Sequence, residues 1–224
     1  MASVQIYDNA KLKIDEAAMN FSADTFRLIL VTSTYTPSVP TDATYANVSA
    51  DEATGTGYTA GGQALTGVSL VYGATALPTI GAGGSGYAVS ATFTVTVSGG
   101  TSTTAAQVSV TTNASGVVTT INSVVVVGSY TVLPTNPAAT TGGTGTGLTL
   151  AMVWGVLVEA ATVTWTTATI SAKYAVVVHQ AGGSLASTDL LVGYVDLNPG
   201  GGNISSTAGN FVVTWSGGDI FSTT

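Results

Sequence analysis

The chain has one histidine, His179, which is the first residue to consider for acid–base chemistry. A nucleophilic triad would place it beside a serine and an acid, and Asp189 with one of the many serines could complete such a set. No Gly-x-Ser-x-Gly elbow occurs in the sequence to mark a nucleophile. We therefore favour the simpler interpretation, in which His179 is a half-exposed residue at the end of an apolar strand.

Carboxylates come closest to a metal site at Asp51 and Glu52, with Asp42 as a third candidate. Calcium takes about 6–8 oxygen ligands, so this group is thin, and a solvated loop is the expected structure. One histidine and no cysteine exclude a zinc site. Paired carboxylates for glycoside hydrolysis stay open in principle, although most acidic residues lie in loops near the two ends. We predict no catalytic residue, no metal and no cofactor.

Gly81-Ala-Gly-Gly-Ser-Gly86 matches the GxGxxG string of dinucleotide-binding folds. That motif needs a strand before it, a helix after it and an acidic residue about 20 positions later. Here a strand is predicted after the glycines, and no acidic residue occurs before Glu159. We therefore interpret the segment as a flexible glycine turn.

Four tyrosines, Tyr58, Tyr72, Tyr87 and Tyr130, lie near glycine-rich segments and could stack on sugars. The alternative is that they pack over the glycine backbone. Nucleic acid is an unlikely class of partner, because the net charge is −7 and the chain has only four cationic side chains. Binding to phosphates by counterion release needs several Lys or Arg residues.

No membrane-spanning segment is expected, because the longest apolar run, Leu148–Val158, is far shorter than the roughly 20 residues that cross a bilayer. The N-terminal sequence lacks the apolar core of a signal peptide, so we expect synthesis in a cytoplasm. Charged residues make up 7% of the chain, against about 25% in ordinary globular proteins. Such a surface resists association poorly, so we expect partner subunits to cover much of it.

Short strands separated by turns predict an all-β protein, with a sandwich or a jelly-roll-like barrel as its core. Thr25–Thr34 is apolar on both faces, whereas Thr92–Val97 alternates with a period of two. A hairpin is predicted around Asn113–Gly116, and short helical turns are predicted to end at Ala17–Met19 and to begin at Thr41 or Asp42. Further strands are predicted at Leu65–Tyr72, Val124–Val127, Leu148–Trp154, Val163–Thr166, Ile170–Gln180, Leu190–Leu197 and Phe211–Trp215, with a turn at Gly217-Gly218.

The charges divide the chain, because the stretch from Ala53 to Val158 contains no Asp, Glu, Lys or Arg. Within this stretch, residues 76–151 are rich in Gly and Thr, and both flanks resemble pieces of one β domain. We therefore predict a discontinuous β-sandwich core, residues 1–75 with 152–224, and a small all-β module inserted at 76–151.

The flanking segments resemble small virion proteins of tailed bacteriophages. In that family a strand, an E-x-x-G-T-G-Y-T-A-G-G turn and a later W-x-x-x-T-I-x-A strand follow in this order, and the turn Glu52–Gly62 is the most specific part. The matching segments are TFRLILVTSTYTPSVPTDATYANVSADEATGTGYTAGGQALTG (Thr25–Gly67), WTTATISAKYAVVV (Trp165–Val178), LLVGYVDL (Leu190–Leu197) and GNFVVTWSGGDIF (Gly209–Phe221).

Relatives usually run directly from a strand like LTGVSLV into one like ATVTW, whereas here residues 76–151 intervene. This insertion is similar to a Gly/Thr-rich module of phage fibre and capsid-associated proteins. The similarity lies in GAGGSGYAV (Gly81–Val89) and GSYTVLPTNPAATTGGTGTG (Gly128–Gly147).

The resemblance implies a structural protein of the virion, not an enzyme. We expect a capsid decoration (cement) protein on the capsid surface, which binds major capsid protein subunits and copies of itself as a homo-oligomer. The alternative is a tail or head fibre, or a receptor-binding module, that recognises a host surface glycan; a glycoside-acting enzyme ranks last. The contact residues we expect are Gly55, Thr56, Gly57, Tyr58, Gly61, Gly62, Tyr87 and Tyr130.

Overall fold

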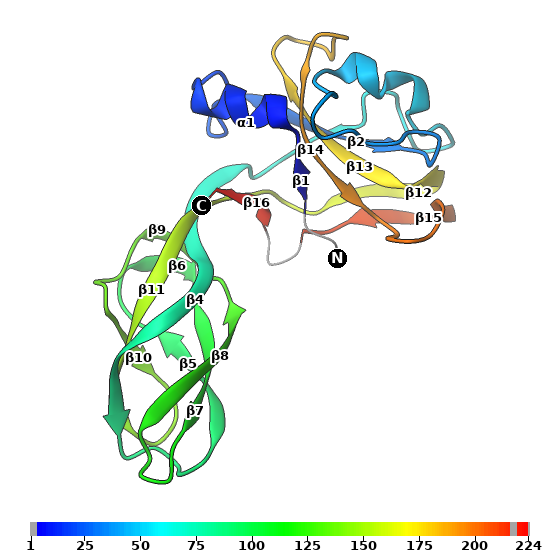
Figure 1. Cartoon of the computed structure of the whole chain (residues 1–224). Coiled ribbons are helices and arrows are strands. Elements are labelled where there is room, and N and C mark those ends of the chain that lie inside the picture. Colours follow the sequence, from blue (N-terminus) through cyan, green and yellow to red (C-terminus); the bar gives the residue numbers. More distant parts are fainter. Residues whose placement is uncertain (1–3, 216–218, 224) are drawn as a thin grey trace. The chain divides into compact units, whose positions relative to one another are not determined.

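The computed structural model describes residues 4–215 and 219–223 (Figure 1). Strands make up 53% of the chain and helices 7%, which confirms the all-β class. The chain divides into two compact units. Unit 1 takes its described residues from Met1–Ser69 and Val158–Phe221, and unit 2 takes them from Leu70–Leu157 and Ser222–Thr224. The predicted turn at Gly217-Gly218 lies outside the described residues.

Unit 1 contains two antiparallel sheets. The larger has the strand order β1-β14-β13-β2-β3, and the smaller pairs β12 with β15. Apolar side chains of both sheets, such as Leu28 and Trp165, belong to one buried core, as in a β-sandwich. The elements are β1 (Gln5–Ile6), α1 (Asp8–Asp15), β2 (Thr25–Val31), η1 (Tyr45–Asn47), η2 (Ser49–Asp51), β3 (Gln63–Ala64), β12 (Val163–Ala172), β13 (Tyr174–Gln180), β14 (Leu190–Asp196) and β15 (Ile204–Val213).

Several local predictions for unit 1 need correction. The long strand predicted at Ile170–Gln180 is two strands, because the chain leaves one sheet at β12 and enters the other at β13. The first helix is α1, which ends before Ala17. The later helical turn begins after Thr44 rather than at Thr41 or Asp42. Thr44 and Asn47 cap that turn reciprocally, which satisfies backbone N–H groups that the short helix leaves free.

Loops cover much of the edge of the larger sheet. Beside β2, Ala53 N donates to Leu30 O at 2.8 Å and Leu65 N donates to Phe26 O at 2.8 Å. Beside β14, Leu191 N donates to Ala43 O at 3.0 Å. Because an open sheet edge is a template for pairing with other chains, these contacts leave little of this sheet for strand addition.

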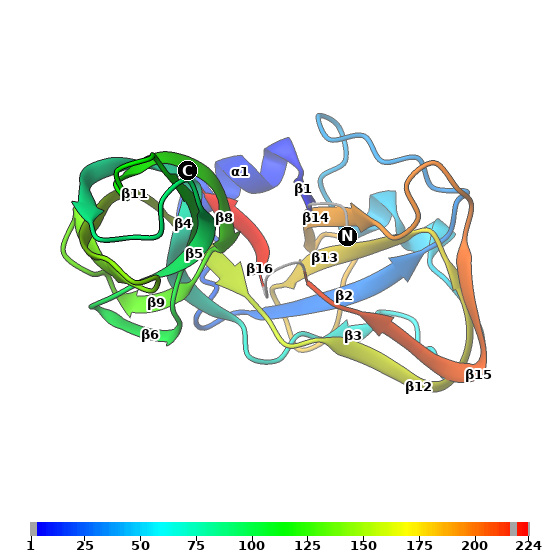
Figure 2. The ribbon, with the colours of Figure 1, turned by 90° about the horizontal axis from the view of Figure 1, so that it is seen from below.

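Unit 2 is built on one curved sheet with the order β6-β9-β4-β11-β10-β5-β7-β8, and β16 pairs with β11. Figure 2 looks along this sheet, whose strands β4, β5, β8 and β11 curl round in a ring. The strands are β4 (Ser69–Ser85), β5 (Thr92–Val97), β6 (Thr101–Thr104), β7 (Gln107–Thr112), β8 (Val118–Val126), β9 (Ser129–Val132), β10 (Ala138–Thr141), β11 (Thr146–Glu159) and β16 (Asp219–Thr223). The end of β11 after Leu157 and the part of β16 up to Phe221 belong to unit 1.

The sheet closes into a barrel because β8 and the segments at its two ends lie against β4. At one end Ala74 N donates to Val127 O at 2.8 Å, and at the other Tyr87 N donates to Gly116 O at 3.2 Å. The interior is filled by alternate side chains of the strands, including Val95, all of them buried. The buried set is Ala74, Tyr87, Val95, Val97, Ala106, Val108, Val110, Val118, Tyr130, Ala138, Leu148, Leu150 and Met152.

The interpretation of Gly81–Gly86 as a flexible turn is wrong, because residues 81–85 belong to β4. These glycines allow neighbouring strands to come close. A Cβ on Gly83 would lie 2.7 Å from Val118 O, and one on Gly84 would lie 2.5 Å from Thr146 O. Both distances are far below van der Waals contact, so a side chain at either position would push the barrel wall apart.

The hairpin predicted around Asn113–Gly116 is present as β7 and β8, and the alternating strand Thr92–Val97 is β5. Val124–Val127 is not a separate strand, since β8 runs on to Val126. The predicted strand Leu65–Tyr72 starts later, at Ser69, and continues as β4. Unit 2 spans Leu70–Leu157, six residues more at each end than the predicted 76–151, because β4 and β11 are long strands.

Candidate contact surface

The glycine-rich turn Glu52–Gly62 is held by the carboxylate of Glu52. One oxygen, Oε1, accepts hydrogen bonds from Tyr58 Oη at 2.6 Å and from Gly61 N at 2.6 Å. The other, Oε2, accepts one from Tyr45 Oη at 2.5 Å. The acid and the tyrosine of this turn bond to each other and hold the loop closed. The specific sequence of the turn therefore has a structural role.

The guanidinium of Arg27 fixes the end of the same turn. Its Nε donates to Gly61 O at 2.6 Å and its Nη2 donates to Gly62 O at 2.7 Å, a forked arrangement that Lys cannot reproduce. Gly62 has φ of 59°, and a Cβ there would lie 2.0 Å from Leu28 O. Only glycine fits at this position.

The two tyrosines that bond Glu52, Tyr58 of the turn and Tyr45 of η1, are held in their protonated form. Burial raises the pKa of Tyr58 and of Tyr45 well above the ordinary range, and the hydrogen bond each phenol makes to Glu52 raises the pKa further. Tyr58 Oη also accepts from Leu30 N at 3.0 Å, and its ring lies 5.9 Å from that of Trp165. The turn is thereby tied to both sheets of unit 1.

The eight predicted contact residues fall into two groups. Gly55, Thr56 and Gly57 are exposed at the tip of the turn, and Tyr58 is half-buried, whereas Gly61 and Gly62 are buried. The remaining two, in unit 2, need correction: Tyr87 is 5% exposed and Tyr130 is 0% exposed. Tyr130 Oη accepts from Ala106 N at 2.9 Å, so its ring is part of the barrel core and offers no surface to a partner.

The carboxylates considered for calcium are separately engaged. Asp42 Oδ2 accepts hydrogen bonds from Tyr35 Oη at 2.6 Å and from Ser38 N at 2.8 Å. Glu52 instead accepts hydrogen bonds from Tyr58 and Gly61 of the turn. Within residues 4–215 and 219–223, no three His, Cys, Asp or Glu side chains form a group that could hold a metal ion.

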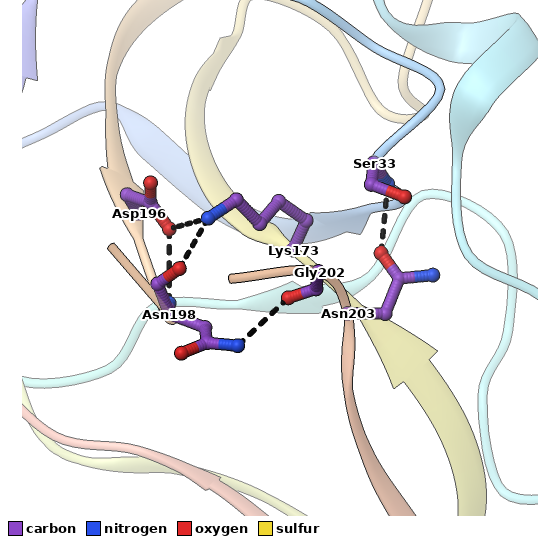
Figure 3. Close-up of polar contacts among 6 residues, drawn as sticks. All are labelled: Ser33, Lys173, Asp196, Asn198, Gly202 and Asn203. Carbon is purple, nitrogen blue, oxygen red and sulfur yellow. Dashed lines mark hydrogen bonds and ion pairs between the residues drawn. The ribbon is translucent and has the colours of Figure 1, made fainter. Parts of the chain in front are cut away.

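Lys173 is a buried cation at the junction of β12 and β13 (Figure 3). Its Nζ forms an ion pair with Asp196 Oδ1 at 2.7 Å and donates to the carbonyl of Asn198. Asp196 Oδ1 also accepts from Asn198 N at 2.9 Å, and Asn198 Nδ2 donates to Gly202 O at 3.0 Å. The ammonium thus organises the loop after β14.

His179 is buried, not half-exposed as predicted. Its Nε2 lies 2.9 Å from Asp24 Oδ2, and its ring stacks obliquely on Phe26 at 5.2 Å. A hydrogen bond from Asn20 N, together with the one from His179, lowers the pKa of Asp24. Asp189, the acid of the imagined triad, instead accepts from Ala181 N and Ala186 N at 3.1 and 2.8 Å. The structure therefore does not join His179 and Asp189.

Residues 70–157 of unit 2 contain no Asp, Glu, Lys, Arg or His, so the surface of this stretch carries no charged side chain. Among its exposed side chains are large apolar ones that the sequence pattern did not single out, notably Leu77, Val125 and Val153. The sequence does carry one sign of this at Leu77. The alternation of apolar and polar residues along the strand breaks where Leu77 meets Pro78. The described helices include none long and apolar enough to cross a membrane.

Comparisons with protein-family models, with curated proteins and with solved structures return no match to this chain.

Proposed function

We propose that the chain is a structural protein of a bacteriophage virion, a capsid decoration protein that binds the assembled head shell. The observation that carries the proposal is the unequal distribution of charged residues between the two units. Unit 1 holds every charged residue of the chain and a rigidly braced turn, whereas unit 2 offers a surface without charge. Neutral surfaces associate without the desolvation cost of buried ions.

The exposed tip of the turn, Gly55-Thr56-Gly57, is the part of unit 1 that we assign to the shell. Glu52 and Arg27 hold the base of this turn from both sides. A preorganised loop loses little conformational entropy on binding. A contact of standard size buries about 1,600 Å², and repeating it over a symmetric shell would hold capsomers together.

The glycan-binding alternative is less well supported by the side chains. Of the tyrosines considered for stacking on sugars, Tyr87 and Tyr130 are buried and Tyr58 is half-buried, which leaves Tyr72 as the exposed ring. A single exposed ring is a weak platform for a sugar chain. We therefore keep decoration of the head as the proposed function.

Cryo-electron microscopy of the virions of the encoding phage tests the proposal directly. Density of this chain repeated over the head lattice and touching capsid subunits is the expected result. Density confined to the tail would reject the proposal and make glycan binding the next function to test. No density, with the chain absent from the purified particle by mass spectrometry, would reject both.

Binding of the purified chain to shells that lack it tests the assigned contact. Thr56→Glu should weaken co-sedimentation with the shells, because a carboxylate would be buried against them. Val212→Glu, at a 47% exposed residue elsewhere in unit 1, is the control with the same added charge and should bind as the unmodified chain does. Equal binding by both variants would remove the turn from the contact.

A further inference from the structure

The strand β15 is the outer strand of the smaller sheet of unit 1 (Figure 1), where it pairs with β12 and with no other described strand. The opposite edge of this sheet belongs to β12 and is covered. There Thr169 N donates to Thr56 O at 2.9 Å. Gln63 Nε2 donates to Thr164 O at 3.2 Å. The sheet is therefore closed along one edge and open along the other.

These two bonds show which backbone groups of β15 face away from β12. Along an antiparallel ladder, pairs that bond each other alternate with pairs whose backbone groups both point outward. Thr164 O is bonded on the covered side, so its pair with Val212 is of the outward kind, and the backbone of Val212 faces the open edge. Ser171 comes two residues after Thr169, whose N–H also faces the covered side, so the backbone of Ser205, which pairs with Ser171, faces the open edge too.

The same alternation places two further residues of β15 at the open edge. We call the backbone groups of these four residues the open edge: Ser205, Thr207, Asn210 and Val212. Between its two halves, Ala208 has φ of 49° and its N–H donates to Thr169 Oγ1 at 3.1 Å, on the β12 side. The side chains of the four residues are exposed, and in the part of the chain that the structure describes nothing bonds their backbone N–H or C=O.

The open edge has few of the features that protect exposed strands from pairing. Proteins blunt such edges with very short strands, charged side chains or proline. The outer strands of the larger sheet, β1 and β3, have two residues each. By contrast, β15 has ten residues and contains neither a charged residue nor a proline. A strand of this length with free backbone groups is a template for adding an extended chain.

The side chains of β15 indicate what the added strand should look like. Phe211 and Val213 are buried in the core of unit 1, whereas Asn210 and Val212 are exposed. Neighbouring strands present their side chains to the same two faces of a sheet. An added strand should therefore alternate apolar residues, which extend the core, with polar residues, which face solvent.

The charge of unit 1 distinguishes the possible sources of that strand. All four basic and all eleven acidic side chains lie in residues 1–69 and 158–221, so unit 1 carries the whole net charge of −7. A second copy of this chain would bring a like net charge to the open edge. A segment with Lys or Arg on both sides of its paired stretch would instead be attracted to unit 1.

We propose that the open edge of β15 receives an extended segment of another protein, in which apolar and polar residues alternate and basic residues flank the paired stretch. The segment would add a third strand to the sheet of β12 and β15. The tip of the turn that we assign to the shell lies along the opposite edge of this sheet, where Thr56 O bonds Thr169 N. The two contacts are separate, so this proposal stands whether or not the chain decorates a virion.

Fluorescence anisotropy of a labelled synthetic peptide, KKTVTVTVKK, titrated with the full-length chain tests the proposal. We expect saturable binding with a dissociation constant below about 100 µM. A peptide of the same composition without the alternation, KTVKVTKVTK, and one with acidic flanks, DDTVTVTVDD, should each bind at least about tenfold more weakly at low salt. No binding of KKTVTVTVKK up to about 1 mM would overturn the proposal, as would equal binding of either control peptide.

Proline at residue 212 tests the backbone contact. Val212→Pro removes one N–H from the open edge and leaves the ladder with β12 its bonds, a placement that edge strands tolerate. It should weaken binding of KKTVTVTVKK about tenfold, the effect of one lost hydrogen bond that leaves a carbonyl unpaired. Val212→Ala keeps the N–H and is the matched control, which should bind nearly as the unmodified chain does. Circular dichroism checks that both variants are folded.

Amide hydrogen exchange followed by NMR tests the same contact without a variant. The amides of Ser205, Thr207, Asn210 and Val212 should exchange rapidly in the free chain and become protected when KKTVTVTVKK is bound. Protection confined to other segments would overturn the proposal, and so would normal binding by folded Val212→Pro. Sedimentation velocity of the chain alone gives the remaining outcome: a dimer that Val212→Pro dissociates would make a second copy the occupant and overturn the proposal.

Discussion

The Glu52–Gly62 turn approaches β2 closely at Gly62 but not at Gly61. Comparing alanine substitutions at these two glycines therefore measures the free-energy cost of blocking that approach. Both residues are buried with positive φ, 59° and 86° respectively. They differ in space: a Cβ on Gly62 would lie 2.0 Å from Leu28 O, whereas one on Gly61 would find its nearest neighbour at 3.6 Å, in Leu185. Gly61→Ala therefore carries backbone strain alone, and Gly62→Ala adds a clash with the strand.

The strain should cost about 1–2 kcal/mol of unfolding free energy at either position. The clash should add about 1–3 kcal/mol, typical of forcing extra atoms into a packed interior. The Gly62 carbonyl must also move away from Nη2 of Arg27, which now lies 2.7 Å from it. We expect Gly62→Ala to be less stable than Gly61→Ala by about 1–3 kcal/mol.

Denaturant unfolding followed by tryptophan fluorescence measures this difference for unit 1. Each unit can unfold separately, so a single transition cannot be assumed. Of the three tryptophans, Trp154 lies in unit 2, and Trp165 and Trp215 lie in unit 1. In a Trp154→Phe background the signal reports unit 1. If the two alanine variants differ by less than about 0.5 kcal/mol, the size of an ordinary surface effect, the steric argument fails.

Three further predictions concern charged side chains of unit 1. Glu52→Gln should lower the unfolding free energy by about 1.5–3 kcal/mol, the worth of a hydrogen bond to a charged group; an unchanged denaturation midpoint would contradict this. A hydrogen bond from Asn20 N lowers the pKa of Asp24. The stability that ionised Asp24 contributes is therefore present above about pH 4 and is lost as the pH falls through the lowered pKa. Thermal unfolding measured from pH 7 to pH 2 should show that the melting temperature of Asp24→Asn falls less steeply with acid than that of the unmodified chain. Lys173→Met should cost about 1–3 kcal/mol, less than the roughly 3–5 for a fully buried pair, since Asp196 stays 27% exposed; adding Asp196→Asn should recover part of that loss in a double-mutant cycle.

Local patterns in the sequence were sufficient for the strands whose two faces differ. Thr92–Val97 alternates because one face meets the barrel core, and β5 has those bounds. Asn113–Gly116 contains its own turn chemistry, since Asn113 Oδ1 accepts from Ser115 N at 2.9 Å and from Val117 N at 3.1 Å. Such features depend on neighbours in sequence, so they can be predicted from composition and spacing alone.

The glycine string at Gly81–Gly86 shows where this reasoning failed. Glycine permits turns, but it also permits close approach of another backbone, and the sequence does not distinguish the two uses. Only the packing of β4 against β8 and β11 assigns these residues to a strand. In the same way, Tyr87 and Tyr130 resembled surface aromatics until the closed sheet placed both in its core.

By itself the sequence determined the all-β class and the concentration of charge outside residues 70–157, because both follow from residue types and their periodicity. The tertiary structure decided which side chains meet. It made Glu52, Tyr58 and Arg27 into one brace, buried His179 against Asp24, and set the ring of Tyr58 5.9 Å from that of Trp165. These pairings join residues distant along the chain, and their register depends on how whole strands align, which no local pattern specifies.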